Sequence, residues 1–298
     1  MTEPISLYCR DNERPDAPVL LLLHGLAENG RSFDALLDAG LDARFRVLTP
    51  DLRGRGKSPR PEWGYSLEEH CQDLLALLDR LNIKQVYIAG HSFGGLLGLY
   101  VAHHHPHRVH GLAMIDVAHQ LHPMSPLFLI LQIDRLGKWF PSEEKYLLSL
   151  RAMPFMTSWD ERMRAVFLED VVRSEAGPLW VLTQKHHVLQ AGTDILRIPA
   201  HTWRQYALQF NGPALLLSAT EPFMMAQPMV PVRHMLALAA LAPNGTHLMI
   251  PGNHTTMLYG NGARVIADKL IRKFLPFRKQ SVDNRQQADP TALAATAR

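Results

Sequence analysis

Cysteine is nearly absent from this sequence, whose 298 residues include only Cys9 and Cys71. One pair cannot build the disulfide network of a small secreted protein, so a reducing compartment is the easier interpretation. A strong excess of one charge is also missing, because 31 Lys and Arg residues stand against 28 Asp and Glu residues. This balance gives no reason to expect a nucleic-acid partner.

Long apolar segments are missing as well. Charged side chains interrupt the first twenty residues, which excludes the apolar core of a signal peptide there; they are Glu3, Arg10, Asp11, Glu13, Arg14 and Asp16. The most apolar stretch in mid-chain, residues 126–133, is shorter than the roughly 18 residues that a membrane span requires. We therefore expect a cytoplasmic protein without a membrane span.

What the sequence does contain is an alternation of short apolar runs and helical repeats. The run at 19–23 is wholly apolar, which is typical of a strand buried on both faces of a parallel sheet. Strands are predicted at 19–23, 46–49, 85–89, 112–115, 214–217 and 246–250, and helices at 67–81, 94–105 and 263–274. This order predicts an α/β fold with a mostly parallel central sheet and helices on both faces.

The alternation stops after Asp116. Residues 118–211 combine helix-like apolar spacing with charged polar faces, which predicts a small helical subdomain, a cap, rather than a loop. The core domain would then comprise residues 1–117 and 212–278. Residues 279–298 have the polar, Ala-rich composition of a disordered tail.

A Gly-x-Ser-x-Gly sequence lies between the apolar strand that ends at Ala89 and the following helix. It reads Gly90, His91, Ser92, Phe93, Gly94. A serine in a sharp strand-to-helix turn is exposed at the edge of the sheet, and flanking glycines leave room for the neighbouring backbone. We therefore expect Ser92 to be a nucleophile.

A nucleophilic serine needs a base and an acid that orients the base, in the chain order Ser, acid, His for this strand–turn–helix arrangement. His254 fits the last place, because it lies in a short polar loop after the strand at 246–250. Two carboxylates compete for the acid. Glu221 follows the strand at 214–217 and is the preferred candidate, while Asp116 follows the strand at 112–115 and is the alternative.

Charge that develops on a substrate oxygen needs two fixed donors. In this arrangement the backbone N–H of Phe93 is expected to supply one and the N–H of Leu26 the other. Leu26 follows His24 and Gly25 at the end of the strand at 19–23, and Gly25 lets that backbone approach the turn at Ser92.

These motifs together resemble the α/β-hydrolase superfamily, in its esterase, C–C hydrolase and epoxide-hydrolase-like branch, over about residues 19–275. His24 and Gly25 resemble the oxyanion-loop motif, residues 51–58 resemble the D-x-R-G-x-G-x-S turn, and residues 90–95 resemble the G-H-S-x-G-G elbow. The chain departs from the family pattern at Glu221, where the family usually has Asp.

The resemblance implies a serine hydrolase that forms an acyl-enzyme, with a carboxylic ester or related acyl compound as substrate. Ser92 in place of Asp argues against epoxide-hydrolase and dehalogenase chemistry.

The segment 118–211 bears on the substrate. Its apolar side chains predict an apolar acyl pocket. Its Lys and Arg residues leave an alternative, in which the partner is coenzyme A or an acyl carrier protein and the activity is that of a thioesterase or acyltransferase. A non-catalytic receptor on the same fold is the third hypothesis. No cofactor or metal is implied.

Overall fold

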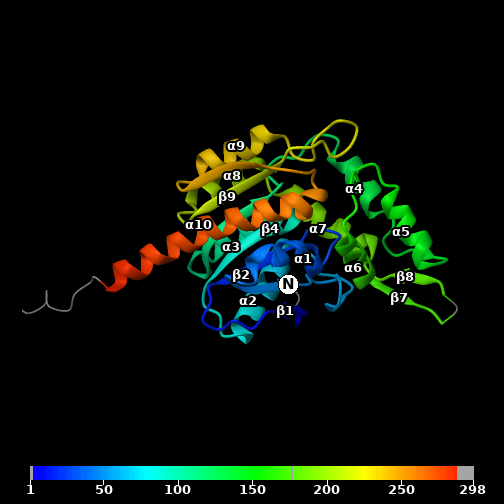
Figure 1. Cartoon of the computed structure of the whole chain (residues 1–298), viewed down its shortest axis with the longest axis horizontal. Helices are drawn as coiled ribbons and strands as arrows, with labels where there is room; N and C mark the ends of the chain where they lie inside the picture. Colours follow the sequence, from blue (N-terminus) through cyan, green and yellow to red (C-terminus); the bar gives the residue numbers. More distant parts are fainter. Residues whose placement is uncertain (1–2, 176, 287–298) are drawn as a thin grey trace, which may run out of the picture.

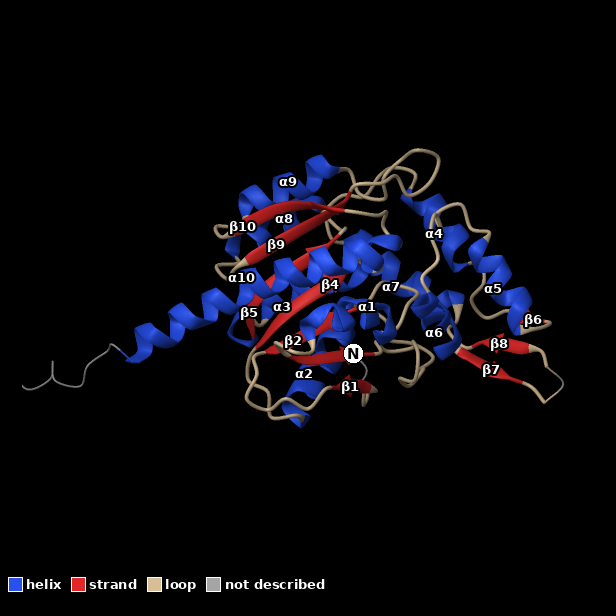
Figure 2. Cartoon of the chain, viewed as in Figure 1, coloured by secondary structure: helices blue, strands red, loops and turns tan. Residues whose placement is uncertain are grey.

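The computed structural model describes residues 3–175 and 177–286, with residues 276–286 described by their backbone alone. Within these residues, seven strands form one sheet in the order β1-β3-β2-β4-β5-β9-β10 (Figure 2). All neighbours are parallel except β1 and β3. The strands are β1 (Cys9–Asp11), β2 (Val19–Leu23), β3 (Arg46–Pro50), β4 (Val86–His91), β5 (Val109–Ile115), β9 (Ala214–Ala219) and β10 (Gly245–Ile250).

Alternate residues of the central strands enter two separate cores, one on each face of the sheet. In β2, Leu21 and Leu23 pack into one core and Leu20 and Leu22 into the other. The first face is covered by α2 (Leu67–Arg80), α3 (Phe93–His104), α8 (Ala200–Gln209) and α9 (Val232–Leu241). The second is covered by α1 (Asp34–Leu36) and α10 (Gly260–Gln286). The predicted α/β fold is therefore confirmed.

The segment between β5 and β9 forms a layer beside the carboxyl ends of the strands (Figure 1). This layer contains α4 (Ser125–Ile133), α5 (Glu143–Arg151), α6 (Glu161–Glu169) and α7 (Lys185–Arg197), whereas α8 of the same segment packs on the sheet with α3 and α9. It also contains an antiparallel sheet that the sequence analysis did not predict, with β6 (Trp139–Phe140), β8 (Leu179–Val181) and β7 (Val171–Arg173) in that order. These strands are only two or three residues long, too short to show a period in the sequence.

Two of the longer helices also differ from the prediction. Helix α9 was not predicted, although its apolar residues pack on the sheet. Helix α10 runs to Gln286, so residues 279–286 of the predicted disordered tail are helical. Lys279 and Gln280 are good helix formers and extend a helix that is already packed on the sheet. Residues 287–298 of that predicted tail lie outside the described residues.

None of the helices in the described ranges is long and apolar enough to cross a membrane.

Candidate active site

Ser92 occupies a sharp turn between β4 and α3. Its φ of 52° and ψ of −121° lie in a region that non-glycine residues rarely adopt. A Cβ added to Gly90 would lie 2.1 Å from the Gly94 carbonyl oxygen, and one added to Gly94 would lie 2.0 Å from the Leu23 carbonyl oxygen. Both glycines are therefore required for the close approach of β2, β4 and α3 that holds Ser92 at the edge of the sheet.

The imidazole of His254 lies between Ser92 and Asp116. Its Nε2 is 3.1 Å from Ser92 Oγ, and its Nδ1 is 2.8 Å from Asp116 Oδ2. An ionised carboxylate only accepts hydrogen bonds, so Nδ1 carries the proton and Nε2 presents its lone pair to the serine hydroxyl. This is the geometry of a serine nucleophile, its base and an orienting acid.

Asp116 is fixed by its surroundings as well as by His254. The side chain is buried, and its second oxygen, Oδ1, accepts a hydrogen bond of 3.0 Å from the Ala219 backbone N–H at the end of β9. The backbone N–H of Asp116 also donates to the Leu217 carbonyl oxygen. The carboxylate thus sits between the ends of β5 and β9 and faces the imidazole.

Glu221, the acid preferred from the sequence, does not reach this site. Glu221 is exposed, and its backbone N–H donates to the Gly252 carbonyl oxygen. In the described part of the chain, no hydrogen bond joins its carboxylate to His254. Strand β9 extends to Ala219, two residues beyond its predicted end, so Glu221 lies in the loop just after the strand, bonded to the backbone of Gly252. Of the two candidate acids, the structure brings Asp116, the alternative, to His254.

Burial is the main influence on the His254 imidazole and lowers its pKa from the ordinary value of 6.5. The hydrogen bond to Asp116 opposes this effect, because it favours the charged ring. The result is a ring that is neutral near pH 7 and can accept the serine proton.

The backbone N–H groups of the two expected oxyanion donors, Leu26 and Phe93, can be traced in the structure. Phe93 is the first residue of α3, where backbone N–H groups lack helical partners. In the described residues, neither the Phe93 N–H nor the Leu26 N–H donates to a protein acceptor. Both amides are therefore available to a substrate oxygen.

His24 fixes the peptide that carries the Leu26 N–H. Its Nε2 accepts a 2.9 Å hydrogen bond from the Leu52 N–H, so the ring donates from Nδ1 to the Gly25 carbonyl oxygen at 2.7 Å. Burial lowers the pKa of His24 to about 4, which keeps this neutral tautomer. In a trans peptide the C=O and N–H point in opposite directions, so the bond to Gly25 also sets the direction of the Leu26 N–H.

Asn253 is a positioning residue that the sequence analysis missed. Its Oδ1 accepts hydrogen bonds from the N–H groups of Thr255 and Thr256, and its Nδ2 donates to the Phe155 carbonyl oxygen at 2.8 Å. The side chain is fully buried. It thereby holds the loop of His254 against the segment between α5 and α6. The only sign of this role in the sequence was that a polar residue directly precedes the predicted base.

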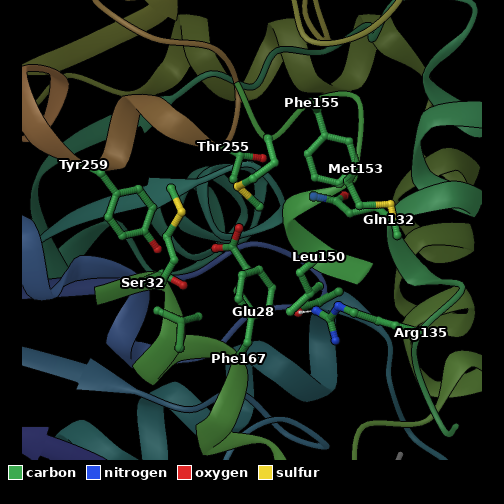
Figure 3. A pocket seen from close by; sticks show the side chains of 14 residues that line it. Glu28, Ser32, Gln132, Arg135, Leu150, Met153, Phe155, Phe167, Thr255 and Tyr259 are labelled. Carbon is green, nitrogen blue, oxygen red and sulfur yellow. Dashed lines mark hydrogen bonds between the residues drawn. The ribbon is translucent and has the colours of Figure 1, made fainter. Parts of the chain in front are cut away.

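A cavity adjoins the site, between the loop after β2 and the segment between β5 and β9 (Figure 3). Its lining includes Ala27, which follows Leu26, and Thr255, which follows His254. Most of the remaining lining is apolar and comes from Leu150, Met153, Phe155, Met156, Met163, Val166 and Phe167. Glu28 points toward the middle of this cavity (Figure 3).

The described residues contain no group of three or more His, Cys, Asp or Glu side chains that could hold a metal ion. The histidine-rich end of α3 instead packs on an aromatic ring, with His103 stacked on Tyr206 at a centroid distance of 3.8 Å.

The curated relatives match only part of the chain. A 3-hydroxybutyrate-oligomer hydrolase from Cupriavidus necator is 35% identical over 41% of this chain and 39% of its own length. The magnesium-chelatase 30 kDa subunit of Rhodobacter capsulatus is 41% identical over 33% of this chain and 35% of its own length. The chain thus covers little more than a third of these relatives.

Solved structures match over most of the chain at low identity. E-2-(acetamidomethylene)succinate hydrolase has a TM-score of 0.75 at 20% identity, covering 91% of this chain and 96% of the other. A thermophilic esterase from Thermogutta terrifontis has a TM-score of 0.64 at 20% identity, covering 92% and 93%. The family model described as the alpha/beta hydrolase fold matches residues 18–260. The chain therefore belongs to the α/β-hydrolase family.

Proposed function

We propose that this α/β-hydrolase cleaves a carboxylic ester with an apolar acyl group through an acyl-enzyme on Ser92. The observation that carries the proposal is the continuous hydrogen-bond chain from Ser92 Oγ through His254 to Asp116. A serine rather than a carboxylate at the turn supports acyl transfer, since the serine oxygen becomes nucleophilic only when a base removes its proton.

In the first half-reaction, Nε2 of His254 takes the proton of Ser92 as Oγ attacks the carbonyl carbon. The negative charge on the substrate oxygen is stabilised by the N–H groups of Leu26 and Phe93. The imidazolium then gives its proton to the departing alcohol oxygen, the carbon–oxygen bond breaks, and an ester on Ser92 remains.

In the second half-reaction, His254 deprotonates a water molecule that attacks the acyl carbon. The bond to Oγ breaks, the carboxylic acid leaves, and Ser92 recovers its proton from the imidazolium. Asp116 keeps the ring oriented and stabilises its cation in both steps, without accepting the proton itself.

The cavity beside the site supports an apolar acyl group. Phe155 lines the cavity and stacks on Phe223 at a centroid distance of 4.7 Å, and Phe223 in turn lies edge-on to His254 at 5.6 Å. An acyl chain that extends from the ester on Ser92 into this cavity would contact aromatic and Met side chains.

A panel of p-nitrophenyl esters of graded chain length, matched acyl-coenzyme A thioesters and lactones tests the proposal. We expect turnover of the oxygen esters with a preferred chain length, and no turnover by Ser92→Ala. A higher kcat/KM for thioesters than for esters of equal chain length would replace the esterase assignment with the thioesterase or acyltransferase alternative. Absence of turnover and of fluorophosphonate labelling would favour a non-catalytic receptor.

A further inference from the structure

Glu28 and His91 form a buried contact that the proposed mechanism does not use. Glu28 lies in the loop after β2, and His91 is the last residue of β4. Their Oε2 and Nδ1 atoms are 3.4 Å apart, and the side chains are 17% and 1% exposed.

The surroundings of His91 favour a proton between the two side chains. Its Nε2 lies 2.8 Å from the His254 carbonyl oxygen, which can only accept, so Nε2 carries a proton. In the described residues Nδ1 is buried and makes no hydrogen bond, and Glu28 Oε2 lies 3.4 Å from it. In a neutral ring the lone pair of Nδ1 would lie beside the carboxylate oxygens, so two acceptors would be close together. A proton on Nδ1 removes this conflict and makes the ring an imidazolium.

The proton could sit on the Glu28 carboxylate or on His91 Nδ1, and a second donor to Glu28 favours His91. The Gly25 N–H donates to the same Oε2 at 3.2 Å, which favours the ionised carboxylate. Although burial acts to raise the pKa of Glu28, the nearby His91 lowers it to about 2. Burial acts to lower the pKa of His91, but Glu28 reverses this and raises it.

The pair connects three parts of the active site. Glu28 binds the backbone of Gly25 in the loop that carries the Leu26 donor, His91 adjoins Ser92, and His91 also binds the backbone of His254. The contact is close: a Cβ on Gly25 would lie 3.1 Å from Glu28 Oε2 and 3.2 Å from His91 Nδ1. The loop of the oxyanion donor and the loop of the base are thereby held together through one ion pair.

We propose that Glu28 and His91 are positioning residues, an imidazolium–carboxylate pair that fixes the oxyanion loop relative to His254. The inference rests on the proposed function. The pair has two effects on catalysis: it keeps the Leu26 N–H and the imidazole in their relative positions, and it places a cation beside the base, with the His91 and His254 rings 4.6 Å apart.

The other charged groups around these rings are few. Asp116 faces His254 from the end of β5 and also acts on His91, while His24 and the Tyr259 hydroxyl lie near Glu28. The cation on His91 lowers the pKa of His254, and Glu28 raises it by a smaller amount. Removing the charge of the pair should therefore raise the pKa of the base.

The test uses Glu28→Gln, which keeps the shape of the side chain and an oxygen for the Gly25 N–H but removes the negative charge. His91→Gln keeps an N–H donor for the His254 carbonyl oxygen and removes the cation. Glu144→Gln, at an exposed position on α5, is the matched control. Each full-length protein is examined by ¹⁵N NMR of its histidine rings, with His91 assigned from the His91→Gln spectrum, and by p-nitrophenyl butyrate hydrolysis between pH 5 and 9.

In the wild type we expect both His91 nitrogens to be protonated at pH 7, and in Glu28→Gln we expect a neutral ring protonated on Nε2. Both variants should lose about tenfold or more in kcat, and the acid limb of kcat/KM should move to higher pH. The control should match the wild type. A neutral His91 in the wild type, or variants with wild-type kcat and pH profile, would overturn the proposal.

Fluorophosphonate labelling of Ser92 separates this inference from the proposed function. If the wild type is labelled and hydrolyses the ester but the variants behave as wild type, only the role of the pair is wrong. If the wild type itself is neither labelled nor active, the hydrolase proposal fails, and the NMR result still decides the charge state of His91. A variant that does not fold leaves the decision to the other variant and to the wild-type spectrum.

Discussion

Nδ1 of His254 lies 2.8 Å from Oδ2 of Asp116, although the two residues are 138 positions apart in the chain. The contact forms because Asp116 follows β5 and His254 follows β10, and these parallel strands end at the same edge of the sheet with β9 between them. This contact supports the proposal that Asp116 orients the base.

Asp116→Asn should lower kcat by up to about 10⁴-fold, because the amide cannot hold the imidazole in the required tautomer or stabilise its cation. Glu221→Gln is the matched control and should retain activity close to the wild type, because the Glu221 residue is exposed. Steady-state hydrolysis of one p-nitrophenyl ester measures both. A severe loss in Glu221→Gln with a mild loss in Asp116→Asn would restore the sequence-based preference.

The pH dependence of kcat/KM should follow the protonation of His254. The base must be neutral, and burial lowers its pKa from 6.5, so activity should be lost as the pH falls through a value below 6.5. Asp116 raises the pKa of this ring, so the acid limb of Asp116→Asn should lie at a lower pH than that of the wild type. This shift is opposite in direction to the one expected for Glu28→Gln. An acid limb above pH 7 in the wild type would contradict this account of the base.

Gly94→Ala should disrupt the turn at Ser92. The new Cβ would meet the Leu23 backbone, which cannot move without shifting β2, so we expect a loss of at least about 1–3 kcal/mol in stability, together with activity. Gly192→Ala is the control, because its Cβ would meet only the ends of two side chains, Leu26 at 3.3 Å and Leu129 at 4.0 Å, and the change should stay within about 1 kcal/mol. Urea unfolding compares the two; equal stabilities would contradict the packing argument.

The ion pair made by the turn at residues 51–58 should matter for stability rather than for catalysis. Arg53 and Asp73 form an ion pair of 2.6 Å with side chains 0% and 1% exposed. Asp73→Ala would leave the guanidinium buried without this carboxylate and should cost about 3–5 kcal/mol. Asp38→Ala breaks the exposed pair with Arg162 and should cost less than about 1 kcal/mol. Similar midpoints of thermal unfolding for the two variants would show that burial of the pair is unimportant.

The sequence was sufficient for the parts of the molecule that depend on local pattern. The apolar run at 19–23 is β2 without change, and the glycines around Ser92 identified the turn because the turn requires them. His254 followed from its place in a polar loop after β10.

The acid and the ion pair could not be found in the same way. Glu221 and Asp116 both follow strands that end at the same edge of the sheet, and the apolar pattern does not show which carboxylate faces His254. The pairing of Glu28 with His91 joins residues on two loops of different strands, and its chemistry appears only when hydrogen-bond donors and acceptors are counted in three dimensions.

The most direct test of the central claim is to find the nucleophile by mass spectrometry. The wild type is treated with a fluorophosphonate, digested, and the modified residue is mapped, with Ser92→Ala and His254→Ala treated in parallel. We predict one adduct on Ser92 in the wild type, none in Ser92→Ala and much slower labelling in His254→Ala. An adduct on another residue, or equal labelling of Ser92→Ala, would contradict the assignment of Ser92 as the nucleophile.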